Sequence, residues 1–139
     1  MAKSKKIMVV DDEAGIRRLL FDVLSGEGFK VSLAKDGQDS LNQMKNHRFD
    51  LLITDINMPR LNGIELLKKM KRAGRKERVI IMTGRSSVDH KRLGKEIPPV
   101  FTKLNKPFHM NNFLEVVSSA LAPQRKRKGK GVMALDGRE

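Results

Sequence analysis

Residues 51–59 read LLITDINMP, and this stretch decides the fold class. Its first four residues, 51–54, form a short and mostly apolar run that Asp55 follows directly. Such a run is typical of a strand that is buried on both faces of a parallel sheet. Comparable runs occur at residues 7–10 and 79–82, and a further strand is expected at about residues 100–104, because Pro98 and Pro99 preclude a helix just before it. A further strand is indicated by the alternation of apolar with polar residues at Phe29, Val31 and Leu33.

Helical patterns separate these runs. The first is an amphipathic stripe with apolar residues at i, i+3, i+4, i+7 and i+8, ended by Ser25-Gly26. The last has the same spacing over residues 113–121, and we expect Asn111 or Asn112 near its cap. Shorter helices are predicted from Asp36-Gly37 onward, around residues 64–70 and, as a polar helix, at residues 86–93.

Strands and helices therefore alternate strictly, five of each, which is typical of a parallel sheet with helices on both faces. The chain has 139 residues, which fits one domain. After Leu121 the composition changes abruptly to PQRKRKGKG. We predict a doubly wound α/β domain over residues 5–122 and a basic, disordered tail over residues 123–139.

The chain is strongly basic, with a formal net charge of +13. This charge favours anionic partners such as nucleic acid, acidic lipid or an acidic protein surface, although a solvated basic surface is the simpler interpretation. The absence of cysteine excludes disulfides and thiolate metal sites. The apolar run at residues 7–10 is too short for a signal peptide or a membrane span, so we predict a cytoplasmic protein without membrane segments.

Polar residues of particular kinds follow the predicted strands. In parallel α/β sheets ligands bind at the carboxyl ends of the strands, so these residues are expected to meet at one edge. They are Asp11 and Asp12 after the first strand, Asp55 after the third, Thr83 after the fourth and Lys106 just beyond the fifth.

Three carboxylates at one edge repel each other unless a cation lies between them. All-oxygen ligation with retained water suits Mg²⁺. A carboxylate such as Asp55 is also a competent nucleophile for a phosphoryl group. Phosphoryl transfer mainly needs positioning and neutralised oxygens, which Mg²⁺, the Lys106 ammonium and the Thr83 hydroxyl could provide.

The chain resembles a CheY-like receiver domain of a two-component response regulator. The matching motifs are VVDDE, AKDGQDSL, LLITDINMP followed by NGIELL, IIMTG and NKPF, and the similarity covers about residues 6–121. The resemblance implies a flavodoxin-like sheet of five strands in the order 2-1-3-4-5 with five helices. It also implies a signalling switch that catalyses only its own phosphorylation and dephosphorylation, and so is not an enzyme toward other substrates.

Site residues follow from the same resemblance. Asp55 would accept the phosphoryl group from the phosphohistidine of a sensor histidine kinase or phosphotransfer protein. Asp12 would bind Mg²⁺ directly, Asp11 through water, and Asn57 through its backbone carbonyl, and Asp55 itself would also be a ligand. Thr83 and Lys106 would bond the phosphoryl oxygens, and the peptide bond before Pro107 is expected to be cis.

Two positions depart from the family pattern. Lys103 stands where the family usually has an aromatic residue whose rotation reports phosphorylation, and Phe101 lies two residues earlier on the same strand face. Arg85 occupies a variable position that tunes the lifetime of the phosphoryl group, and its guanidinium could hold or shield a phosphoryl oxygen.

The output is expected to be a protein contact. Only about eighteen residues follow the last helix, too few for a further domain, so a single-domain regulator is predicted. Its target would bind the face formed by the fourth helix, fifth strand and fifth helix, which could also form a dimer. A receiver cut from a longer protein is the alternative.

Other interpretations remain open from the residues alone. A dehalogenase-type phosphatase also uses a strand-end aspartate with Mg²⁺, but it needs a second aspartate where this chain has Asn57. A nucleic-acid-binding protein would explain the basic charge, although the tail has no aromatic residue and no recognition motif. The pair Asp11-Asp12 could also be no more than a helix N-cap.

Overall fold

The computed structural model describes residues 4–84 and 90–123. In these ranges the strands are β1 (Lys6–Val10), β2 (Lys30–Ala34), β3 (Leu51–Asp55), β4 (Arg78–Thr83) and β5 (Val100–Asn105). The helices are α1 (Ala14–Gly26), α2 (Gly37–Met44), α3 (Gly63–Arg72), the 3₁₀-helix η1 (His90–Glu96) and α4 (Met110–Leu121). The strict alternation that the sequence predicts is confirmed.

The five strands form one parallel sheet in the order β2-β1-β3-β4-β5. β1 lies between β2 and β3, so the strand order reverses beside β1, and this is where ligands of such sheets bind. Val10 pairs with Thr54, which brings the carboxyl ends of β1 and β3 side by side. The predicted flavodoxin-like fold is confirmed.

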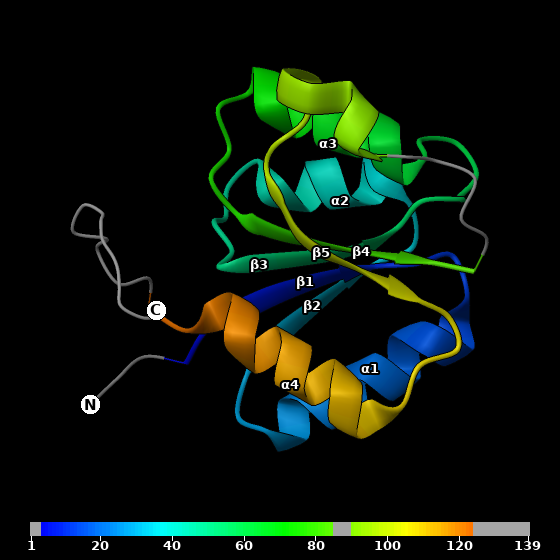
Figure 1. Ribbon diagram of the computed structural model, residues 1–139, viewed down its shortest axis with the longest axis vertical. Helices are drawn as coiled ribbons and strands as arrows, with labels where there is room; N and C mark the ends of the chain where they lie inside the picture. Colours follow the sequence, from blue (N-terminus) through cyan, green and yellow to red (C-terminus); the bar gives the residue numbers. More distant parts are fainter. Residues whose placement is uncertain (1–3, 85–89, 124–139) are drawn as a thin grey trace, which may run out of the picture.

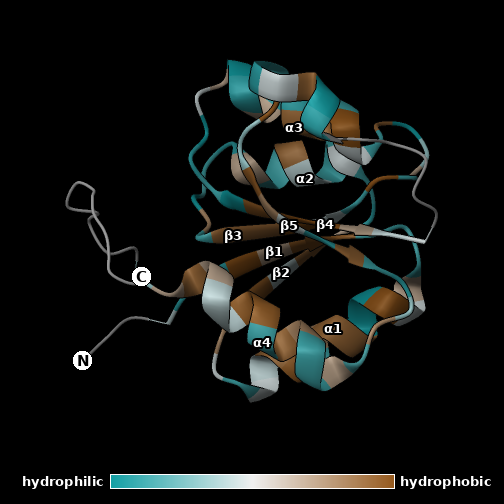
Figure 2. Cartoon of the chain, in the orientation of Figure 1, coloured by the Kyte–Doolittle hydropathy of each residue, from teal (hydrophilic) through white to brown (hydrophobic). Residues whose placement is uncertain are grey.

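Helices cover both faces of the sheet (Figure 1). Helices α1 and α4 lie on one face, and α2, α3 and η1 lie on the other. Alternate residues of a central strand therefore enter different cores: Ile7 and Val9 pack with α1 and α4, whereas Met8 and Val10 pack with α2 and α3. Figure 2 shows that the strands are mostly hydrophobic, whereas the helices on either side of the sheet carry both hydrophobic and hydrophilic residues. Burial on both faces explains the continuous apolar runs.

The helix between β4 and β5 differs from the prediction at residues 86–93. Residues 86–89 lie outside the described part of the chain, and η1 extends to Glu96, three residues beyond the predicted end. The backbone turns inside η1 at Gly94, where φ is 51°. A polar segment without an apolar stripe contains little information about where its helix begins and ends.

The starts of α4 and α1 can be compared with the sequence expectations. Helix α4 begins at Met110 with His109 at the N-cap position, so Asn111 and Asn112 lie in its first turn, near the cap as expected. Helix α1 begins at Ala14 with Glu13 at the N-cap position, so the interpretation of Asp11-Asp12 as an N-cap pair is wrong. The acidic pair is therefore left for another role.

None of the helices in the described ranges has both the length and the apolar character that a membrane span requires.

Candidate functional site

Three carboxylates converge at the carboxyl ends of β1 and β3. One carboxylate oxygen from each of Asp11, Asp12 and Asp55 lies within 4.8 Å of the other two. Asp11 is fully buried and Asp55 is 6% exposed, whereas Asp12 is exposed. The structure therefore brings together the three side chains that the strand-end argument predicted.

Backbone amides orient the two buried carboxylates. The amide of Glu13 donates to Asp11 Oδ1 at 2.9 Å, and the amide of Ile56 donates to Asp55 Oδ1 at 2.8 Å. In each residue the second oxygen, Oδ2, then faces the ammonium of Lys106. Both side chains are held in one orientation before any ligand arrives, which is the preorganisation that a phosphoryl-transfer site needs.

Lys106 places a half-buried ammonium among these acids. Its Nζ lies 2.8 Å from Asp11 Oδ2, 3.3 Å from Asp55 Oδ2 and 3.5 Å from Glu13 Oε1. The Lys106 amide donates to the carbonyl oxygen of Thr83 at 2.8 Å, which fixes the residue against the end of β4. The following peptide bond, to Pro107, is cis, as predicted.

Burial is the largest single influence on the pKa values of Asp55 and Lys106. Burial raises the pKa of the Asp55 carboxyl above its usual 3.8; the Lys106 charge opposes this, and the Asp11 charge adds to it. Burial acts to lower the pKa of Lys106, but the hydrogen bond to Asp11 and the charges of Asp11 and Asp55 outweigh it and raise that pKa. Lys106 therefore stays charged, and a cation bound beside Asp55 would favour the ionised form of its carboxyl.

An open cleft of about 470 Å³ lies beside this cluster. Its lining is acidic and rich in oxygen donors, which are the ligands that Mg²⁺ takes in proteins, and an open cleft leaves room for the waters that Mg²⁺ keeps. The residues present therefore fit Mg²⁺. The cleft is lined by Asp12, Glu13, Asp55, Asn57, Gly84 and Lys106.

The other predicted residues are placed less completely. Thr83 is buried at the end of β4, opposite Asn105 of β5, and its neighbour Gly84 lines the cleft. Arg85 lies outside the described residues. Lys103 and Phe101 lie on β5, where Lys103 is half-buried and Phe101 is 49% exposed. The modulating roles of these last three residues stay predictions.

Two residues at the site were missed by the sequence argument. Glu13 lines the cleft and approaches Lys106, and it directly follows the acidic pair in VVDDE. Gly63 begins α3, and its amide donates to the carbonyl oxygen of Ile56 at 2.8 Å. A Cβ at Gly63 would lie 2.2 Å from the Asp55 carbonyl oxygen, so only glycine lets α3 approach the acceptor strand.

Helix α3 begins at a strong cap that holds this close approach in place. The Asn62 side chain accepts from the Glu65 amide at 2.9 Å, and the Glu65 side chain accepts from the Asn62 amide at 3.1 Å. This reciprocal pair is a capping box. The sequence signal was present in NGIELL, but its meaning for the site depends on the contact between Gly63 and Asp55.

Comparison with known proteins assigns the family. The response regulator receiver domain family matches residues 7–118. The chain belongs to this family, and it is a CheY-like receiver domain of two-component signalling.

Individual relatives include both short and longer proteins. The chain is 36% identical over 118 residues to sporulation initiation phosphotransferase F of Bacillus subtilis, covering 85% of this chain and 94% of that protein. It is 32% identical over 130 residues to response regulator MprA of Mycobacterium sp. (strain KMS). That match covers 94% of this chain but only 56% of MprA, so the chain spans about half the length of this relative.

Solved structures agree with the fold. Chemotaxis protein CheY4 of Vibrio cholerae matches with a TM-score of 0.78 and 29% identity, over 86% of this chain and all of that one. Response regulator protein TrrA of Thermotoga maritima, in complex with Mg²⁺ and BeF, matches with a TM-score of 0.72 and 31% identity, over 84% of this chain and 99% of that one.

Proposed function

We propose that this receiver takes a phosphoryl group onto Asp55, with Mg²⁺, from the phosphohistidine of a sensor histidine kinase or phosphotransfer protein. The observation that carries the proposal is the arrangement of three carboxylates within 4.8 Å of one another, with the Lys106 ammonium 3.3 Å from Asp55 Oδ2. The Mg²⁺-containing TrrA complex supports the choice of metal. A cytoplasmic location remains part of this proposal.

The contacts of the two Asp55 carboxylate oxygens distinguish the atom that reacts. Because Oδ1 is held by the Ile56 amide, Oδ2 is the oxygen that forms the bond to phosphorus. The phosphorus–nitrogen bond to the donor histidine then breaks, and its electron pair returns to the imidazole. Lys106 already lies beside Oδ2, so its ammonium is within reach of an oxygen of the transferred group.

A bound Mg²⁺ would neutralise part of the charge on the transferring phosphoryl group. Asp12 is suited to hold it directly, since its carboxylate is exposed and lines the cleft. Asp11 is suited to a contact through water, because both of its oxygens already accept hydrogen bonds, from the Glu13 amide and from Lys106. Asp55 and Asn57 line the same cleft and complete the proposed set of ligands.

A second, apolar cleft of about 350 Å³ adjoins the acidic one, because Lys106 lines both. Leu19, on its rim, is 43% exposed. A phosphodonor that covers this apolar cleft would place its histidine next to Asp55, so we propose α1 and the segment after β5 as its docking surface. The remaining lining residues are Ile16, Leu20, Pro107, Phe108 and Met110.

The output is proposed to be a protein contact on the face of η1, β5 and α4. Phe101 of β5, a large hydrophobic side chain that is 49% exposed, would be part of this contact. Action as a single domain, and formation of a dimer through this face, are part of the same proposal. The protein acts on itself as a switch and turns over no other substrate.

The test is incubation with Mg²⁺ and acetyl phosphate, followed by intact mass spectrometry. We expect the mass of one phosphoryl group to be added to the wild type, and no addition in Asp55→Asn or when a chelator is present. Asp50→Asn is the matched control, since Asp50 precedes the same strand at its opposite end. Phosphorylation of Asp55→Asn to the wild-type extent would refute the assignment of Asp55.

A further inference from the structure

The amino ends of the strands form an edge of the sheet opposite to the acidic cluster. Backbone hydrogen bonds connect neighbouring segments there: Lys30 N donates to Lys5 O at 2.9 Å, Asp50 N to Lys6 O at 2.8 Å, and Arg78 N to Asp50 O at 3.3 Å. Because the strands are parallel, their first residues and the loops before them share this edge. We call this surface the amino-end face.

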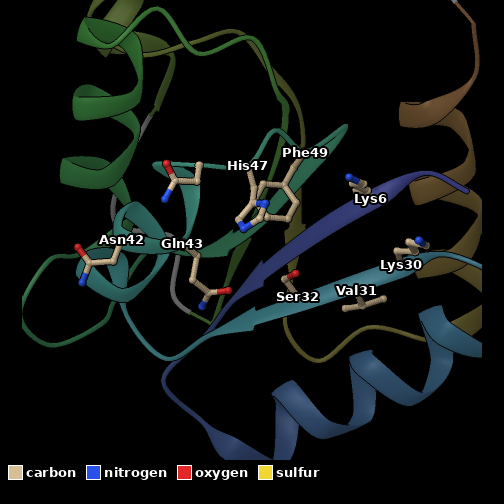
Figure 3. A pocket seen from close by; sticks show the side chains of 9 residues that line it. Lys6, Lys30, Val31, Ser32, Asn42, Gln43, His47 and Phe49 are labelled. Carbon is tan, nitrogen blue, oxygen red and sulfur yellow. The ribbon is translucent and has the colours of Figure 1, made fainter.

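Three clefts hollow the amino-end face, with volumes of about 420, 340 and 270 Å³. The half-buried ring of Phe49 lines all three, so the clefts adjoin one another around it. Figure 3 shows the largest cleft, with the side chains of two neighbouring strands on one side and those of α2 and the following loop on the other. Its labelled residues include Lys6, Lys30, Asn42, Gln43 and His47.

Most of the cations that line these clefts have no acidic partner. Among the described residues, no ion pair joins an acidic side chain to any of five exposed cations. They come from the starts of β1 and β2 and from the loops before β3 and β4, so they surround the clefts on several sides. These cations are Lys5, Lys6, Lys30, Arg48 and Lys76.

Two other arginines at this edge bind groups of the protein itself. The Arg75 guanidinium forms an ion pair with Glu77 and donates to two backbone carbonyls, and that of Arg78 donates to the carbonyls at the end of α4. Glu77 is thereby neutralised and is buried. Asp50 is the one exposed carboxylate among the residues that line the three clefts in the described part of the chain. The face is therefore strongly positive.

We propose that the amino-end face binds a single strand of nucleic acid, remote from the phosphorylation site. The unpaired ammonium and guanidinium groups would contact successive phosphates. Phe49 offers a ring for a base to stack on, and Asn42 and Asn46 offer amides to base edges. Proteins that bind single strands combine a positively charged groove with aromatic side chains on which bases stack, and Phe49 supplies one such ring here.

An acidic membrane fits the amino-end face less well. Binding at a membrane interface needs apolar side chains that enter the lipid beside the basic ones. In the described residues the exposed large hydrophobic side chains are Leu19, Phe21 and Phe101, which lie on α1 and β5 and line none of the three clefts. The polar, concave lining is better matched to a flexible phosphodiester chain.

The experiment measures fluorescence anisotropy of labelled oligouridine, oligothymidine and a DNA duplex, each of about 20 nucleotides or base pairs. The full chain is titrated at about 50 to 200 mM NaCl. One variant combines Lys5→Gln, Lys30→Gln and Lys76→Gln on the amino-end face. A charge-matched control combines substitutions of exposed cations that line none of the clefts: Arg18→Gln, Lys35→Gln and Arg92→Gln.

The amino-end variant is expected to bind single strands about a hundredfold more weakly than the wild type near 0.1 M salt, with a log–log salt slope shallower by about 2. This follows because each phosphate contact contributes about 0.7 to that slope for a single strand. The control variant should stay within a few fold of the wild type. Both variants should accept a phosphoryl group from acetyl phosphate normally, which shows that they are folded.

Several results would overturn the proposal. Equal losses in both variants would mean attraction by overall charge only. Wild-type affinity in the amino-end variant, combined with loss on replacing Arg125, Lys126, Arg127 and Lys128 by Gln, would assign binding to the tail. Tighter binding of the duplex, or binding of anionic vesicles alone, would give the face another ligand. A wild type that resists phosphorylation would count only against the function of Asp55.

Discussion

Substitution of Gly63 by alanine tests how the acceptor strand and helix α3 are fitted together. The new Cβ would lie 2.2 Å from the Asp55 carbonyl oxygen, 2.9 Å from Ile56 Cα and 3.1 Å from the Asp55 carbonyl carbon. The first distance is about 0.8 Å shorter than 3.0 Å, the limit below which real Cβ contacts essentially never fall. All three neighbours are backbone atoms, so the clash can be relieved only if β3 and α3 separate.

Overpacking of this kind costs about 1–3 kcal/mol of unfolding free energy. For a domain of this size the melting temperature should fall by about 3–5 °C for each kcal/mol. Gly15→Ala is the matched control, because no atom lies within 4 Å of a Cβ at that position in α1. There, alanine should stabilise the protein by about 0.5–1 kcal/mol, since glycine has the greater freedom in the unfolded chain.

Urea denaturation of the wild type and the two variants measures these differences in unfolding free energy, provided that the dependence of the free energy on urea concentration has the same slope in all three proteins. Because the clash displaces the backbone at Asp55, Gly63→Ala should also reduce the extent of phosphorylation by acetyl phosphate, while Gly15→Ala should not. A Gly63→Ala protein with the denaturation midpoint and phosphorylation of the wild type would refute the close-approach reasoning.

Three further predictions concern charge. With a chelator present, Asp55→Asn should be more stable than the wild type in urea at pH 7. Because the folded-state pKa of Asp55 is raised, its ionisation destabilises the folded wild type only as pH rises above about 3.8. The difference in unfolding free energy should therefore vanish on titration toward pH 4. Mg²⁺ at a hundred times its Kd should stabilise the wild type by about 2.7 kcal/mol in thermal denaturation, and Asp12→Asn should lose most of this gain. Arg75→Leu leaves the Glu77 carboxylate buried without its counter-ion and should lower the unfolding free energy, measured in urea, by about 3–5 kcal/mol. Arg18→Ala, in an exposed pair with Asp22, should lower it by under about 1 kcal/mol. Equal losses in the two variants would contradict the burial argument.

Much of the fold could be predicted because the central strands are buried on both faces. Residues 51–54 read as a continuous apolar run for this reason, and β3 extends only one residue further, to Asp55. The amphipathic stripes of α1 and α4 were visible because each helix covers one core. The segment between β4 and β5 has no such stripe, and there the predicted helix differed from η1.

The candidate site was predicted from position rather than from contacts. Parallel strands bring their carboxyl ends to one edge, so Asp11, Asp12 and Asp55 had to meet once the fold class was known. The role of Glu13 could not be predicted in the same way, because it depends on a contact with Lys106, which is 93 positions away along the chain. Sequence spacing contains no information about such a distance.

The sequence by itself therefore determined the alternation of elements, the fold class and the set of residues at the carboxyl edge, since these follow from local periodicity and the geometry of parallel strands. Tertiary structure alone decided which Asp55 oxygen the Ile56 amide holds and which faces Lys106, why Gly63 must be glycine, and which cations of the amino-end face lack acidic partners. Each of these depends on contacts between distant segments. Such contacts are decided by how the whole backbone packs, and no local pattern records them.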